Sequence, residues 1–133
     1  MVDDNVADVK LLESLFKLGR LEVQLRVARD GEEALRALKN SPFEGKEDPD
    51  LILLDLSLPK IDGQEVLEKI KSDPSLKQIQ VLILTGSQNP RDRELAKKYR
   101  ADGFLTKAKE AKDFSALVKR IEDFWLDFKG KTA

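Results

Sequence analysis

The feature that most constrains the fold is an unbroken apolar run from Leu51 to Leu54, which ends at Asp55. Such a run predicts a strand that is buried on both faces, as in a parallel sheet covered by helices on each side. Binding and catalytic groups in these sheets lie at the carboxyl ends of the strands. A carboxylate in a buried position also needs a partner. We therefore expect Asp55 to be a functional residue.

Composition excludes several classes of site. The chain has 133 residues and is 41% hydrophobic, which predicts a single domain, residues 1–133, with one core. It has no cysteine and no histidine, so disulfides, thiolate metal sites and histidine general bases are excluded. Carboxylates, hydroxyls, lysine and arginine remain for any chemistry.

Charge and hydropathy indicate the environment and the partners. The chain carries 24 basic and 25 acidic residues, so we expect no nucleic-acid partner. No apolar segment approaches the roughly 18 residues of a membrane span, and the first residues are acidic rather than basic as in a signal peptide. We expect a cytoplasmic protein that does not enter membranes.

Apolar periodicity predicts alternating strands and helices. Asp30 is expected to cap the second helix, with Glu33 three residues later, and Asp73-Pro74 to end the third. The pattern indicates a doubly wound α/β sheet. The expected strands are 22–28, 51–54, 81–84 and 103–106, and the expected helices are 8–18, the segment after Asp30, the segment around 66–70, 90–99 and 113–128.

Polar side chains stand at the predicted strand ends. Asp55, Thr85 and Lys107 each follow an apolar strand, and Asp3-Asp4 follow Val2 as if another strand had just ended. If these ends share one edge, several carboxylates meet there, and like charges that close require a cation. Hard carboxylate oxygens suit Mg²⁺, so the edge is a candidate magnesium and phosphate site.

Five segments of the chain form one ordered pattern: Asp3-Asp4-Asn5, Asp30-Gly31-Glu32-Glu33-Ala34-Leu35, Asp55 with Leu58-Pro59 and Asp62-Gly63, Leu84-Thr85-Gly86-Ser87, and Ala101-Asp102-Gly103-Phe104-Leu105-Thr106-Lys107. In this order and spacing they resemble the receiver domain of two-component response regulators. The stretch from Ser72 to Ile79 and the aromatic last helix are most similar to the phytochrome-associated single-domain regulators.

The resemblance implies a flavodoxin-like sheet of five parallel strands in the order 2-1-3-4-5, with helices on both faces. Only Met1 and Val2 precede Asp3, so the first strand is very short: either upstream residues are absent or the pairing is shortened. The family places proline after the lysine, whereas Ala108 follows Lys107 here. We expect this peptide bond to be trans and the following loop to take a different path.

The same resemblance assigns roles to residues. Asp55 would accept a phosphoryl group from a histidine kinase, first of all a phytochrome-type kinase. Mg²⁺ would be bound by Asp3, Asp4, Asp55 and the backbone carbonyl of Ser57. Lys107 and Thr85 would contact the phosphoryl oxygens, and Thr85 with Phe104 would form the switch. The chain would act as a stand-alone regulator through protein contacts, with at most self-phosphorylation and autodephosphorylation activity.

Other interpretations remain open at this point. The fold could serve as an interaction module without phosphorylation, or the site could belong to an aspartate-nucleophile phosphatase, although Ser57 stands where such enzymes place a second aspartate. Asp3-Asp4 could be an acidic helix start. Three aromatic residues of the last helix could form a homodimer contact or pack within the chain: Phe124, Trp125 and Phe128.

Overall fold

A parallel three-stranded sheet forms the centre of the protein in this computed structural model, which describes residues 1–19, 25–39, 50–56, 63–86, 90–107 and 114–132. The strands lie in the order β1-β2-β3. Both strand pairs are parallel, with Leu54 opposite Ile83 and Ile83 opposite Phe104. The bounds are β1 (Leu51–Leu54), β2 (Gln80–Thr85) and β3 (Gly103–Thr106).

Single-residue pairings extend this sheet beyond β1. Val2 pairs in parallel with both Leu54 and Ala28. Backbone hydrogen bonds hold it on each side, from Val2 N to Leu53 O at 2.8 Å and from Asp3 N to Ala28 O at 3.0 Å. Across the sheet the order is Ala28, Val2, β1, β2 and β3. With strands counted along the chain from Val2, this is the predicted order 2-1-3-4-5, and the predicted fold class is confirmed.

The predicted second strand, residues 22–28, is wrong in its described part. Ala28 alone pairs, residues 25–27 are not in a strand, and residues 22–24 lie outside the described part of the chain. Backbone hydrogen bonds still join this segment to the start of the chain, from Met1 N to Arg26 O at 2.7 Å and from Ala28 N to Met1 O at 2.9 Å. The first strand is represented by the bridge residue Val2.

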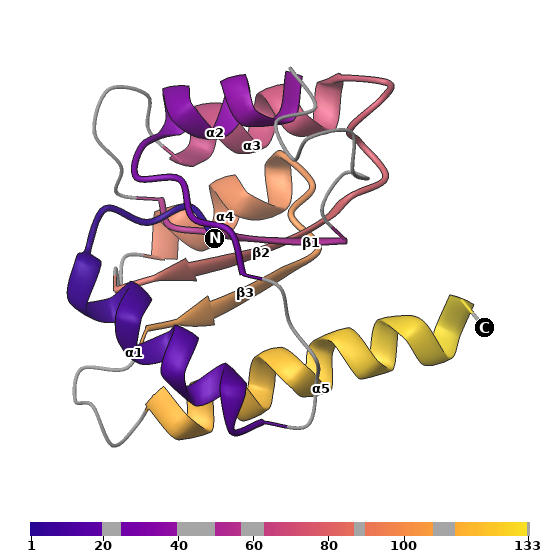
Figure 1. The fold of residues 1–133 in the computed structure, drawn as a ribbon. Helices are drawn as coiled ribbons and strands as arrows, with labels where there is room; N and C mark the ends of the chain where they lie inside the picture. The colour runs from indigo at the N-terminus through magenta and orange to yellow at the C-terminus, as the bar shows by residue number, and fades with distance from the viewer. Residues whose placement is uncertain (20–24, 40–49, 57–62, 87–89, 108–113, 133) are drawn as a thin grey trace.

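Helices cover both faces of the sheet (Figure 1). Leu82 and Leu84 of β2 face one core and Val81 and Ile83 face the other, because successive side chains of a strand point to opposite faces. One core is closed by α1 and α5, the other by α2, α3 and α4. The bounds are α1 (Val6–Lys17), α2 (Gly31–Lys39), α3 (Gly63–Ser72), α4 (Pro90–Lys98) and α5 (Phe114–Thr132).

Capping residues set the helix starts. Asp30 accepts a hydrogen bond from Glu33 N at 2.8 Å, as predicted for the cap of α2. The first helix begins two residues earlier than predicted, because Asn5 caps it by accepting from Asp8 N at 3.1 Å. Asp3-Asp4 therefore precede the helix and do not form its first turn.

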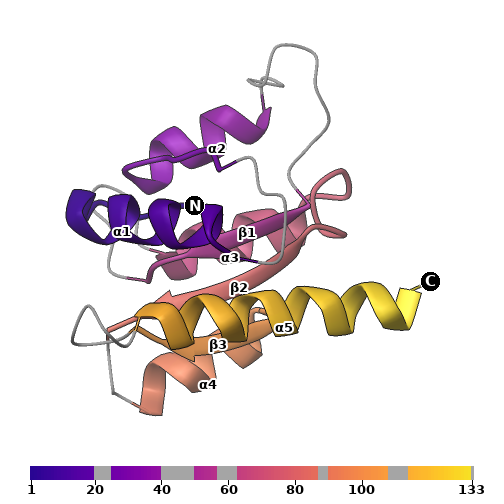
Figure 2. The same ribbon diagram turned by 60° about the horizontal axis from the view of Figure 1, so that its bottom comes forward.

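Helix ends agree less closely with the predictions. Helix α3 ends at Ser72, directly before Asp73-Pro74, as expected. Helix α4 ends at Lys98, one residue before the predicted end. Helix α5 continues to Thr132 instead of ending at Phe128, and its carboxyl end extends past the sheet (Figure 2).

Candidate functional site

The carboxyl edge of the sheet brings one ammonium group together with three carboxylates. Lys107 follows β3, and its Nζ lies 2.6 Å from Asp3 Oδ2 and 2.9 Å from Asp55 Oδ2. The third carboxylate belongs to Asp8 in the first turn of α1, at 3.1 Å. The resulting cluster joins residues from the start of the chain, the first helix and two strand ends.

Backbone hydrogen bonds fix the strand ends that carry these groups. Asp55 N donates to Val2 O at 3.0 Å, and Lys107 N donates to Thr85 O at 2.7 Å. The Asp3 side chain is oriented by the Asn5 backbone, whose N–H donates to Oδ1 at 2.9 Å. The positions of Asp3, Asp55 and Lys107 thus follow from sheet pairing and from the turn that leads into α1.

Burial and the neighbouring charges together determine the charge state of this cluster. Asp3 is 2% exposed and Asp55 is 7% exposed. Burial raises the pKa of the Asp3 carboxyl, and the Lys107 ammonium and the Asn5 N–H oppose this only in part. Burial also lowers the pKa of Lys107, but Asp3 and Asp55 outweigh it, so the net pKa of Lys107 is raised. Lys107 therefore remains a cation near neutral pH.

Two carboxylates of this cluster, together with the neighbouring Asp4, could also hold a metal ion. Asp3, Asp4 and Asp55 each offer an oxygen within 4.8 Å of the others. Asp3 Oδ2 is buried and, despite its ion pair with Lys107, accepts no hydrogen bond of good geometry from any described residue. A buried carboxylate oxygen without a hydrogen bond can coordinate a further cation, and a set of oxygen ligands suits a hard divalent cation. Ser57, whose carbonyl was also predicted as a ligand, lies outside the described residues.

Thr85 and Phe104 occupy neighbouring strands. Thr85 ends β2 and is fully buried. Phe104 lies opposite Ile83 in the sheet register, is half-buried, and packs against the core under α4. The Arg93 guanidinium of α4 lies 5.4 Å from the centre of the Phe104 ring. Phe104 thus contacts both the core and a charged group on the surface helix.

Comparison with known proteins identifies the family. Residues 1–121 match the response regulator receiver domain. The chain belongs to this family. It is 40% identical over 128 residues to response regulator Rcp1 of Synechocystis sp., covering 96% of this chain and 87% of Rcp1.

Solved structures agree with this assignment. The phosphorylated cyanobacterial phytochrome response regulator RcpA superposes with a TM-score of 0.87 at 40% identity, over 94% of this chain and 90% of RcpA. The Mn²⁺-bound form of Rcp1 superposes with a TM-score of 0.83 at 40% identity, over 94% and 91% of the two chains. The predicted resemblance to phytochrome-associated regulators is confirmed, and the chain is a receiver domain of phosphorylation-based signalling.

Two residues of this receiver domain were missed from the sequence. Asp8 was expected only as the start of a helix, yet it contacts Lys107. Gly63 was noted only as part of a segment that resembles the family, with no role of its own, yet a Cβ atom there would collide with the Asp55 carbonyl oxygen and lie 2.5 Å from Leu56 Cα. The Asn5 cap was a signal for Asp8, because it places residue 8 in the first helical turn. No local sequence pattern predicts that the backbone of Asp55 and Leu56 lies this close to Gly63.

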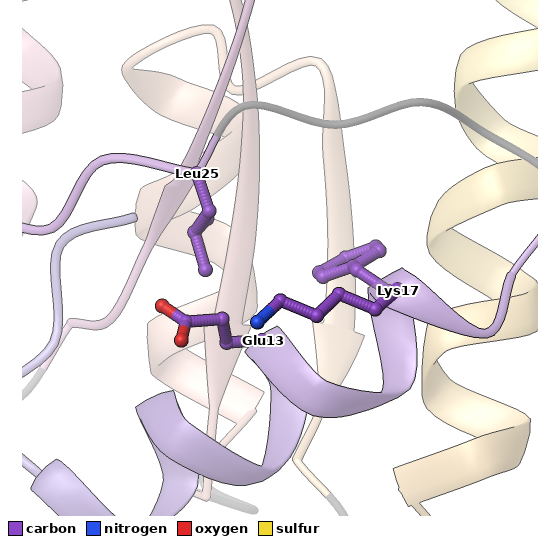
Figure 3. A pocket seen from close by; sticks show the side chains of 4 residues that line it. Glu13, Lys17 and Leu25 are labelled. Carbon is purple, nitrogen blue, oxygen red and sulfur yellow. The ribbon is translucent and has the colours of Figure 1, made fainter.

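A small pocket of about 210 Å³ lies beside the second half of α1 (Figure 3). It is lined by Glu13, Phe16, Lys17 and Leu25, and the Glu13 and Lys17 side chains extend toward the space below Leu25. Glu13 is five residues beyond Asp8, or roughly 7.5 Å along the helix axis. The pocket is therefore separate from the cluster around Lys107.

None of the helices in the described part of the chain combines the length and hydropathy that a membrane crossing needs.

The aromatic residues of α5 divide into two groups. Phe124 packs against the core closed by α1 and α5, and its ring lies next to Gly103 of β3. Trp125 and Phe128 are half-buried, with ring centroids 5.3 Å apart, and Leu126 between them is 41% exposed. Packing within the chain thus accounts for Phe124 more fully than for the other two.

Proposed function

We propose that Asp55 accepts a phosphoryl group from a phosphohistidine of a sensor kinase. The observation that carries the proposal is the 2.9 Å contact between Lys107 Nζ and Asp55 Oδ2 at the carboxyl edge of the sheet. In the transfer, an Asp55 carboxylate oxygen forms a bond to phosphorus. The bond from phosphorus to the donor's imidazole nitrogen breaks, and its electron pair returns to the imidazole.

Positioned charge supports this reaction. Transfer places negative charge on the phosphoryl oxygens, and preorganised cations stabilise that charge. Lys107 supplies one cation from the end of β3. Mg²⁺, when bound, would supply the second; Asp3, Asp4 and Asp55 would hold it together with the Ser57 carbonyl. The Mn²⁺-bound form of Rcp1 is a precedent for a divalent cation in a similar receiver domain.

Thr85 and Phe104 would transmit the change. A phosphoryl oxygen on Asp55 would accept a hydrogen bond from the Thr85 hydroxyl, and Phe104 would then move inward in β3. The contact of Phe104 with Arg93 supports this role, because inward movement of the ring would release a cation on the surface of α4. The signalling surface would consist of α4, β3 and α5.

The kinase would be of the phytochrome type. This part of the proposal rests on the similarity to Rcp1 and to the phytochrome response regulator RcpA. Residues 1–133 would act as one receiver domain, with no catalysis beyond self-phosphorylation and autodephosphorylation. Phosphoryl transfer from purified phosphorylated kinases tests the pairing, and faster transfer from unrelated kinases than from a phytochrome kinase would overturn it.

Incubation with acetyl phosphate and Mg²⁺ tests the central proposal. The protein should gain one phosphoryl group on Asp55, read by intact mass and peptide mapping, and Asp55→Asn should abolish the gain because an amide is a much weaker nucleophile. Asp50→Asn makes the same chemical change at an exposed residue at the opposite end of β1 and should leave phosphorylation intact. Continued turnover of phosphate esters without a stable phosphoprotein would point instead to a phosphatase.

We also propose that the end of α5 forms a homodimer contact through Phe124, Trp125 and Phe128. Half-exposed aromatic surface on a helix that extends past the sheet supports this proposal. Trp125→Glu should shift the protein toward monomer in sedimentation equilibrium at micromolar concentration, since a charge at the contact must be desolvated. Only monomer in wild-type protein, with and without a phosphoryl mimic, would contradict the dimer.

A further inference from the structure

Asp8 contacts Lys107 but does not belong to the group of carboxylates that could hold a metal, which among the described residues is Asp3, Asp4 and Asp55. We propose that Asp8 is a positioning residue: it holds the Lys107 ammonium in the unphosphorylated protein and competes with the incoming phosphoryl group for it. This inference rests on the proposed role of Asp55 as phosphoacceptor.

The Asp8 carboxylate is carried by a fixed element. Its backbone N–H donates to Asn5 Oδ1 at 3.1 Å, so the residue belongs to a capped first turn of α1. The same helix is anchored by Leu12 and Phe16 in the core that α5 closes. Asp8 therefore approaches Lys107 from a rigid helix, not from a loop.

The ammonium has as many carboxylate neighbours as it has donors. A lysine ammonium offers three N–H groups. Lys107 Nζ lies 2.6 Å from Asp3, 2.9 Å from Asp55 and 3.1 Å from Asp8. Two of these contacts, with Asp55 and Asp8, are hydrogen bonds, and the third is an ion pair with Asp3, so a phosphoryl oxygen that approaches the ammonium competes with three carboxylates for it.

The contact with Asp8 is the one that opens most easily. Its distance is the longest of the three, and its side chain is 24% exposed, compared with 1% for Asp3 and 9% for Asp55. Water can therefore replace Lys107 at Asp8 at less cost than at either buried carboxylate. The negative charge of Asp8 also repels an incoming phosphoryl dianion. Competition for Lys107 and this repulsion together would slow phosphorylation.

The inference predicts that Asp8→Asn accelerates phosphorylation by acetyl phosphate at saturating Mg²⁺. The expected gain is about two- to fivefold, the range of a partly exposed ion pair. Calorimetry should give a Mg²⁺ dissociation constant of the same order as that of wild type, because Asp8 lies outside the group of carboxylates that could hold the metal. The ¹⁵N resonance of the metal-free Lys107 ammonium should shift, and Asp8→Glu should restore the slower rate.

Glu13→Gln is the matched control, since it removes one exposed charge from the same helix far from Lys107. It should leave the rate, the metal affinity and the Lys107 resonance at their wild-type values. An Asp8→Asn rate equal to or below wild type would overturn the inference while leaving Asp55 as phosphoacceptor. Absence of any phosphorylation in wild-type protein would overturn the proposed function and this inference together.

Discussion

Gly63→Ala should destabilise the protein by about 3 kcal/mol, at the upper end of the usual cost of overpacking. The new Cβ would collide with the Asp55 carbonyl oxygen and lie 2.5 Å from Leu56 Cα, so backbone atoms on both sides must move. The hydrogen bond from Gly63 N to Leu56 O, 3.0 Å long, would be distorted as well. Urea denaturation of the metal-free protein measures the loss.

The same substitution should weaken Mg²⁺ binding, because the displaced backbone is that of Asp55. Gly86→Ala is the control: it makes the same chemical change at a position where a Cβ would meet nothing within 4 Å. Its free energy of unfolding should stay within about 0.5 kcal/mol of wild type. Equal stability of the two variants would show that Gly63 does not set the position of the Asp55 backbone.

Asp102→Ala should cost about 3 kcal/mol, because it leaves a buried charge without its partner. Lys71 Nζ is 2.7 Å from Asp102 Oδ2, and the two side chains are 8% and 25% exposed. The same oxygen accepts a hydrogen bond from Val81 N at 2.8 Å, so the substitution also leaves a buried amide unsatisfied. Among the described residues, the partners that remain for Lys71 are the carbonyls of Lys77 and Ile79.

Two comparisons isolate the ion pair. Glu65→Ala removes a carboxylate from an exposed pair with Lys69, whose atoms lie 4.0 Å apart, and should cost no more than about 0.5 kcal/mol. Adding Lys71→Met to Asp102→Ala should recover part of the lost stability, since it removes the unpaired charge. If denaturation shows equal losses for Asp102→Ala and Glu65→Ala, the interaction at Asp102 is not a buried ion pair in solution.

The sequence predicts the elements that bear strong local patterns. β1 and β2 are visible as apolar runs, so the positions of Asp55 and Thr85 at strand ends follow from the chain alone. The cap at Asp30 is equally local. The apolar runs and the cap predict these elements correctly because each depends on residues that are close together in the sequence.

The rest depends on contacts between distant segments. In the described part of the second strand, Ala28 forms a bridge with Val2 and residues 25–27 form none, which the alternating pattern of residues 22–28 does not predict. Lys71 and Asp102 are 31 residues apart, and lysine and aspartate are residue types that usually lie on the surface, so the sequence does not predict their buried contact. Asp8 and Lys107 are 99 residues apart. Such pairs become visible only when the topology brings their elements together.

The single-residue pairing of Val2 has a thermodynamic consequence. Asp3 and Asp4 follow Val2 directly, so a cation that binds them with Asp55 also ties the start of the chain to the end of β1. Binding that favours the paired state stabilises it, and by linkage the paired state binds the cation more tightly. With a cation bound at these carboxylates, metal affinity and closure of the sheet edge would form one coupled equilibrium, in which a change on either side alters the other.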